Sequence, residues 1–198
     1  MTNEQKQVII SGVLGDGHLR SNGSILLSCI HKEYMDLKAV LLGDIVSPSG
    51  VYARENNGYK KGIIYRVDSV ANDYGKKLYK GSLEEAIKDI DELGLSLWFL
   101  DDGSLHKKNF FYNISTHSFP LKEQTEVLVP LLNRFGIYPK IYSETKKDGR
   151  QFNYLYVSKY QGAFKISENP ANLIFVNALE ESSCKPSKFG AYSSRLYS

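Results

Sequence analysis

Hydrophobic and polar positions along this chain switch between a helical and a strand period, and the same order of periods occurs twice. Helical periodicity over 4–15 stops before Gly17, and residues 18–30 alternate around Asn22-Gly23, which predicts a hairpin. The rest of the first half predicts a helix at 33–46 ended by Pro48 and Gly50, a hairpin of 51–56 with 62–69, and a helical stretch at 82–90. The second half predicts a helix at 93–102, strands at 104–108 and 110–116, a helix at 121–135 ended by Gly136, strands at 137–143 and 151–157, and helical C-terminal segments.

An internal repeat with an offset of 86 residues accompanies this order. Asp16-Gly17 returns as Asp102-Gly103, Tyr52 as Tyr138, and Arg54 as Lys140. Further on the offset becomes 89, which matches Arg66 with Leu155, although a frame that turns Tyr154 and Tyr156 outward is equally open. The pattern predicts the α+β class, with two αββαββα halves at 1–91 and 92–198.

Composition narrows the class of protein. Hydrophobic content of 42% and charged content of 24% are ordinary for a globular chain. Two cysteines cannot build a disulfide framework, which favours a reducing compartment. No apolar run approaches the roughly 20 residues that span a bilayer, and the N-terminal residues lack the layout of a signal peptide. We expect an intracellular protein, in the cytoplasm or an organelle matrix, without a membrane partner.

The net charge of +3 is small, but the basic residues are clustered. They gather at turn-like, glycine-containing places, where solvated loops and phosphate contacts along a groove are both possible functions. The clusters are Lys60 and Lys61, Lys76, Lys77 and Lys80, Lys107 and Lys108, and Lys146, Lys147 and Arg150.

Both copies of the first helix end in a carboxylate. Helical spacing puts Asp16 on the face of Ile9, Gly12 and Val13, and Asp102 on the face of Leu95, Trp98 and Phe99. The small residues Ser11, Gly12, Gly15 and Ser96 would allow a close approach of two helices. If the two stripes pack in parallel, the aspartates lie side by side at the negative ends of the helix dipoles.

Two adjacent carboxylates either share a proton or bind a divalent metal ion. Basic loops nearby favour the metal, and hard oxygen ligands with a phosphate substrate favour Mg²⁺. Trp98 and Phe99 are expected in the core and not on a base-stacking surface. His31 and His117 are expected to cap or pack, with a catalytic role as the alternative.

The segments IISGVLGDG (9–17) and LSLWFLDDG (95–103) resemble the two motifs of single-chain LAGLIDADG homing endonucleases. The segments after the first hairpins, SCIHKEYMDLKAVLL (28–42) and STHSFPLKEQTEVLV (115–129), and the basic SSCKPSKFG (182–190) also resemble that family. The resemblance covers nearly the whole chain. It implies two halves packed through the motif helices, saddle-shaped sheets over a long asymmetric DNA target, and metal-dependent cleavage that leaves short 3′ overhangs.

The resemblance also implies site residues. Asp16 and Asp102 would hold two or three Mg²⁺ ions shared between the halves, and the backbone carbonyls of Gly15 and Asp101 would add ligands. A lysine from each half would lie near the scissile phosphates. Lys80 and Lys188 match those positions best, with Lys185 a close competitor for the second.

DNA contacts would divide into strand and loop residues. Arg20, Arg54, Arg66 and Lys140 are the candidates for base edges, and the basic loops are candidates for phosphates. With both motifs in one chain, we expect a monomer. An RNA maturase for a group I intron is the alternative function, and a DNA-binding regulator without cleavage is disfavoured because both aspartates are present.

Overall fold

The computed structural model describes residues 1–56, 62–106, 111–145 and 148–158. The chain forms two compact units, Met1–Trp98 and Phe99–Ser198, and each is considered by itself. None of the described helices combines the length and apolar character that a membrane span requires. The α+β class and the order of elements predicted from the sequence are confirmed.

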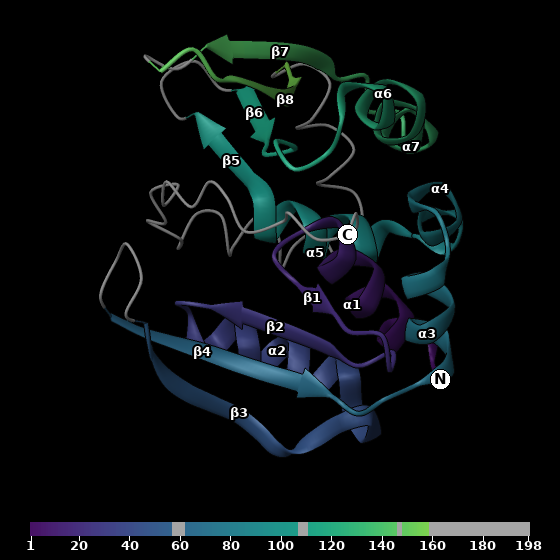
Figure 1. Ribbon diagram of the computed structural model, residues 1–198, viewed down its shortest axis with the longest axis vertical. Helices are drawn as coiled ribbons and strands as arrows, with labels where there is room; N and C mark the ends of the chain where they lie inside the picture. The colour runs from purple at the N-terminus through teal and green to yellow at the C-terminus, as the bar shows by residue number, and fades with distance from the viewer. Residues whose placement is uncertain (57–61, 107–110, 146–147, 159–198) are drawn as a thin grey trace. The chain divides into compact units, whose positions relative to one another are not determined.

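The first unit follows the predicted αββαββα order (Figure 1). Its strands form one antiparallel sheet in the order β1-β2-β4-β3, with α2 packed on one face. The strands are β1 (His18–Leu19), β2 (Ile25–Cys29), β3 (Val46–Asn56) and β4 (Gly62–Ser69). The helices are α1 (Asn3–Leu14), α2 (Lys32–Leu42), η1 (Gly43–Ile45), α3 (Asp73–Lys80), α4 (Leu83–Ala86) and η2 (Ile87–Asp89).

Helix α1 is buried on all sides along its middle. Thr2 and Gln5 form a capping box at its start, in which the Gln5 side chain accepts a hydrogen bond from the Thr2 amide at 2.8 Å. Every residue from Val8 to Gly12 is buried, so the helix is not amphipathic but enclosed. The buried Gln7 side chain donates to the Asp89 carbonyl at 2.8 Å and accepts from the Asp91 amide at 3.0 Å. These bonds hold α1 against the chain that leads into the second motif helix.

Two predictions about the first unit are wrong. The helix predicted over 33–46 ends at Leu42 because Gly43, at φ 54°, stops it, and its buried side includes Met35 and Leu42 while Val40 is 76% exposed. Pro48 and Gly50 lie instead in β3, where the pairing with β4 shifts register between Val46 and Val51.

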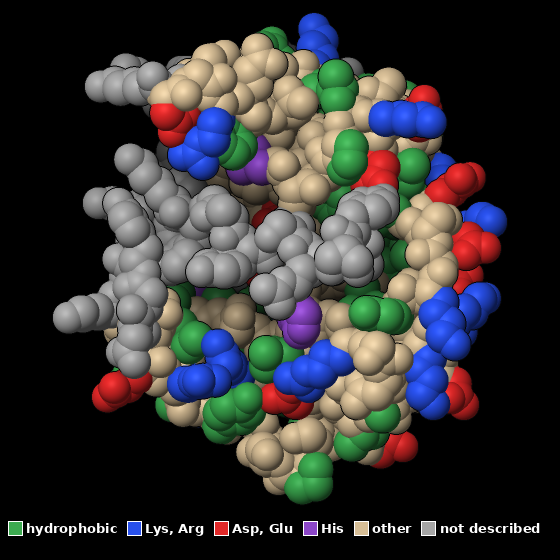
Figure 2. Space-filling model, viewed as in Figure 1, with side chains coloured by type: hydrophobic (Ala, Val, Ile, Leu, Met, Phe, Trp, Pro, Cys, Tyr) green, Lys and Arg blue, Asp and Glu red, His purple; other side chains and the backbone are tan. Residues whose placement is uncertain are grey.

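The cluster of Lys76, Lys77 and Lys80 is not in a turn. It lies on α3, whose start is capped by the Asn72 side chain accepting from the Gly75 amide at 2.7 Å. Basic and acidic side chains alternate along this edge of the molecule (Figure 2).

The second unit repeats the order as far as the described residues extend. It contains α5 (Glu92–Asp102, begun in the first unit), β5 (Gly103–His106), β6 (Phe111–Ile114), α6 (Leu121–Glu123), η3 (Gln124–Leu128), α7 (Val129–Arg134), β7 (Lys140–Thr145) and β8 (Gln151–Val157). The strand order is β5-β6-β8-β7, equivalent to that of the first sheet. The predicted helix 121–135 includes a π-helical turn at η3, because Pro130 has no amide hydrogen to bond to the preceding turn.

Strand register settles which face each sheet buries. Leu27 pairs with Val67 in the first sheet, Ile114 pairs with Leu155 in the second, and all four side chains are buried. Superposing these pairs makes Arg66 equivalent to Tyr154 and not to Leu155, so the frame with Tyr154 and Tyr156 outward is confirmed. The same register makes Tyr52 equivalent to Tyr142 and Arg54 to Glu144, which corrects the matches with Tyr138 and Lys140.

The second unit depends on a buried glutamine. Gln124 has no exposed surface, and its side-chain amide donates to the carbonyls of Thr116 and Phe119 at 3.0 and 2.9 Å, while its oxygen accepts from the Thr116 hydroxyl at 2.9 Å. These three bonds tie the start of the helical segment to the end of β6.

Gln124→Met should lower the free energy of unfolding by roughly 2–4 kcal/mol, because the side chain keeps its length while buried polar groups lose their partners. The exposed Gln151 is the matched control, and Gln151→Met should change stability by less than about 0.5 kcal/mol. Chemical denaturation followed by circular dichroism measures both. Equal stability of the two variants would contradict the assigned role.

Candidate functional site

Asp16 lies directly after α1, where the backbone turns tightly. The Gly15 amide donates to the Ser11 carbonyl at 2.8 Å, and the Gly17 amide donates to the Gly12 carbonyl at 2.8 Å. A Cβ on Gly17 would lie 2.6 Å from the Gly12 carbonyl oxygen, closer than any side chain tolerates. Glycine is therefore required after the acid, and the turn directs Asp16 to an exposed position at the end of the helix.

Asp102 is the last residue of α5 and is half-buried. Its carbonyl accepts a hydrogen bond from the Ser115 amide at 2.9 Å, which joins the end of the helix to the chain after β6. A Cβ on Gly103 would collide with the Phe99 carbonyl oxygen and lie 2.7 Å from the Phe99 ring. The same steric requirement thus fixes the acid-glycine pair in both halves.

The ends of both motif helices are electrostatically negative. Neither α1 nor α5 has a basic residue in its last turn, so the partial negative charge of the helix end adds to that of the aspartate. Carboxylate oxygens and the neighbouring backbone carbonyls of Gly15 and Asp101 are hard donors, which suit Mg²⁺ or Mn²⁺. Within the described residues, no group of three or more His, Cys, Asp or Glu side chains assembles a metal site.

Small residues on α1 do a different job from the one expected. A Cβ on Gly12 would lie 2.6 Å from the Ile25 side chain and 2.7 Å from that of Leu27. Gly12 therefore lets α1 approach strand β2 of its own unit. Trp98 and Phe99, at 0% and 7% exposure, are core residues as predicted.

The outward face of the first sheet carries a polar network. Arg20 forms an ion pair with Asp68 at 2.8 Å, and the Tyr52 hydroxyl donates to the other Asp68 oxygen at 2.8 Å. Burial, and then the bond to Asp68, raise the pKa of the Tyr52 hydroxyl. Arg66 stands on the same face between Ser28 and Tyr52, and its Nε is buried without a hydrogen-bond partner among the described residues.

The outward face of the second sheet is aromatic. His106 and Phe111 stack at 4.5 Å between ring centroids, and Phe111 lies 4.9 Å from Tyr156. Tyr142 continues the row, 5.1 Å from Tyr156 and 6.1 Å from Tyr154. The row crosses all four strands of the sheet.

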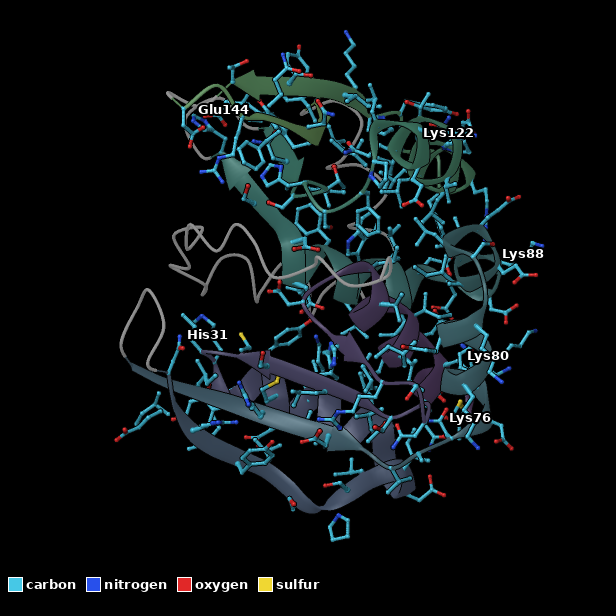
Figure 3. All side chains as sticks on the ribbon, viewed as in Figure 1. His31, Lys76, Lys80, Lys88, Lys122 and Glu144 are labelled. Carbon is cyan, nitrogen blue, oxygen red and sulfur yellow. The ribbon has the colours of Figure 1, made fainter. Side chains whose placement is uncertain are left out.

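The remaining predicted contacts occupy varied places. Arg54 on β3 and Lys140 on β7 are exposed. Arg150 is bonded to Asp148 at 2.7 Å, and this bond lowers the pKa of the Asp148 carboxyl. Lys80 is the exposed last residue of α3 (Figure 3). Seven predicted residues or competitors lie outside the described ranges: Lys60, Lys61, Lys107, Lys108, Lys146, Lys147 and Lys188, and so does Lys185.

One buried cation escaped the sequence analysis. Lys38 on α2 is 2% exposed, and its ammonium lies 4.5 Å from the centre of the Tyr34 ring. The Tyr34 hydroxyl donates to the Leu97 carbonyl at 3.1 Å, in the second motif helix. The only signal in the sequence was that Lys38 falls between Met35 and Leu42 on the buried side of α2. The two candidate histidines differ: His31 precedes α2 without capping it, whereas the His117 ring contacts the Asn153 carbonyl at 2.9 Å.

These features define a duplicated α+β protein in which each half ends its first helix in an acid and presents one antiparallel sheet. The sequence profile of the LAGLIDADG DNA endonuclease family matches residues 6–163, and the chain belongs to that family. A search of curated proteins finds no significant match.

Solved structures show the same fold. The homing endonuclease I-WcaI bound to its DNA recognition sequence is similar at 20% identity and a TM-score of 0.63, covering 90% of this chain and 82% of that chain. I-DmoI in complex with DNA and Mn is 11% identical, with a TM-score of 0.46 and coverage of 91% and 99%. Full-length DUF199/WhiA from Thermatoga maritima is 14% identical, with a TM-score of 0.50 and coverage of 90% and 56%.

The acid-glycine turns can be tested through stability. Gly17→Ala and Gly103→Ala should each lower the free energy of unfolding by roughly 1–3 kcal/mol, because the added methyl group meets backbone that must move. Gly62→Ala is the control, since a Cβ there meets nothing within 4 Å. Denaturant melts compare the three. A Gly17 variant as stable as the Gly62 variant would refute the steric account.

Proposed function

We propose that this protein is a site-specific double-strand DNA endonuclease in which each half supplies one aspartate to a shared active site. The observation that carries the proposal is the equivalent placement of Asp16 and Asp102, each fixed by a glycine turn at the negative end of a motif helix. Membership of a DNA endonuclease family makes a phosphodiester the natural substrate.

Divalent metal ions complete the proposed site. Asp16 and Asp102 would hold two or three Mg²⁺ ions together with the carbonyls of Gly15 and Asp101, because helix ends without basic residues attract cations. The ions would neutralise charge that develops on the scissile phosphates. The chain itself orients the ligands through the backbone bonds of Gly17 and of Asp102. No covalent bond between enzyme and DNA is required.

A cation from each half would assist at the phosphates. Lys80 is exposed at the end of α3 and is the proposed residue in the first half, and Lys188 is the proposed residue in the second. Buried Lys38 is bonded into the core beside Tyr34 and is a weaker candidate for moving toward a phosphate.

The two sheets would bind the major groove on either side of the cut, and the cleavage would leave short 3′ overhangs. Because the faces of the two sheets differ, the target would be asymmetric, and a single chain carrying both motifs would act as a monomer. Arg54, Arg66 and Lys140 would contact base edges, while the basic loops and Arg150 would hold phosphates.

Asp16→Asn and Asp102→Asn should each reduce double-strand cleavage at least about a hundredfold and leave DNA binding largely intact. The substrate is a randomised duplex library with Mg²⁺, from which the wild-type target is first recovered. Asp36→Asn and Asp148→Asn, at exposed acids of the first and second units, are the controls and should cut normally. Normal double-strand cleavage by either motif variant would remove that aspartate from the site.

The same assay separates the alternative function. An RNA maturase would bind its intron RNA tightly while the library stays uncut by the wild-type protein in Mg²⁺ or Mn²⁺. That outcome would refute the endonuclease proposal.

Lys80→Ala should slow cleavage by about a hundredfold with little loss of affinity, because the proposed role is in stabilising charge and not in binding. Lys88→Ala is the matched control, since Lys88 follows α4 in the same part of the first unit (Figure 3). Single-turnover rates and equilibrium binding on the recovered target are the measurements. Equal rates for both variants would exclude Lys80.

A further inference from the structure

The two sheets present chemically opposite outward faces at equivalent positions. With the buried pairs superposed, Arg20 of the first sheet is equivalent to His106 of the second, and Tyr52 to Tyr142. The remaining two positions differ most. Arg66 is replaced by Tyr154, and Asp68, which binds both Arg20 and Tyr52, is replaced by Tyr156.

The aromatic row of the second sheet, which we define as His106, Phe111, Tyr156, Tyr142 and Tyr154, is packed ring against ring. His106 and Phe111 are nearly parallel, with 8° between their planes, and Tyr142 and Tyr154 differ by 20°. Phe111, Tyr156 and Tyr142 each have an aromatic neighbour on two sides. The neighbours therefore cover much of the ring faces, and the row presents ring edges and tyrosine hydroxyls outward.

This orientation discriminates between ligands. Stacking of unpaired bases needs an open ring face, which the inner rings of the row do not offer. Ring edges instead suit apolar groups that project from a duplex, and the major groove exposes one such group, the 5-methyl of thymine. Tyrosine hydroxyls can meanwhile donate to or accept from base edges.

The charged groups around the row also fit a duplex. Lys140 pairs directly with Tyr156, and Glu144 lies farther along β7, toward its end (Figure 3). Within the described strands of this sheet, Lys140 is the single Lys or Arg, whereas Arg54 and Arg66 occupy the strands of the first sheet. The second sheet is thus poor in guanine-reading arginines and rich in apolar edges.

We propose that the aromatic row of the second sheet recognises thymine methyl groups in its half of the DNA target, while the first sheet reads its half through arginine. The inference rests on the proposed DNA-binding function and adds the chemical class of base pairs read by each half. It names Phe111, Tyr142 and Tyr156 as specificity-determining residues.

Replacing thymine by uracil removes only the methyl group and tests this directly. A target is first selected by binding to the double variant Asp16→Asn, Asp102→Asn from a randomised duplex library. Each half-site is then synthesised with uracil in place of thymine, and dissociation constants are measured by fluorescence anisotropy. Affinity should fall about fourfold per contacted methyl in one half-site and remain unchanged in the other.

Variants assign the effect to the row. In Phe111→Ser and Tyr142→Ser proteins the penalty for uracil should shrink toward one, because the contact is already lost. Tyr138→Ser is the matched control, since Tyr138 is an exposed tyrosine of the same unit that lies outside the sheet, and it should keep the full penalty.

The possible failures are distinguishable. Selection of no preferred duplex would overturn the proposed function itself. A preferred duplex whose binding is indifferent to uracil in both half-sites would overturn the inference alone. A target bound equally well with one half single-stranded would also overturn it, because stacking on unpaired bases would then be the function of the row.

Discussion

The structure depends on one close approach of backbone to backbone at the end of each motif helix. The chain after the aspartate turns back so tightly that Gly17 meets the carbonyl of Gly12, and Gly103 meets that of Phe99. A side chain at either glycine would push the turn open and move the preceding carboxylate. The acid and the glycine are therefore one steric unit, and the chemistry of the site is inseparable from the packing of the helix end.

Charge is arranged differently at the helix ends and on the sheets. The helix ends concentrate negative charge, which is costly unless a cation joins them. On the first sheet, Asp68 already neutralises Arg20, and at the second hairpin Asp148 neutralises Arg150. Exposed pairs of this kind contribute little stability, but they restrain the arginine side chains before any ligand arrives. Arg54 and Arg66 lack a printed-length ion pair of this kind and are the cations of the first sheet best placed for a partner.

The two halves share their interiors and differ outside. Leu27 with Val67 and Ile114 with Leu155 fill the same places, because each sheet must bury one face in close-packed surroundings. The opposite faces bear no such constraint, so an Arg–Asp–Tyr network in one half corresponds to stacked aromatic rings in the other. A duplicated fold can diverge in this way without changing its topology.

The sequence by itself determined the duplication, the order of elements and the two acid-glycine turns, because periodicity and turn residues are local signals repeated at a fixed offset. It misplaced the end of α2 and read α3 as a turn, since Gly43 and the Asn72 cap outweighed the hydrophobic pattern. Only the tertiary structure decided the phase of β8 and the burial of Lys38. Strand phase depends on hydrogen-bonded register with partners distant in sequence, and a lysine is buried only where folded neighbours such as Tyr34 surround it.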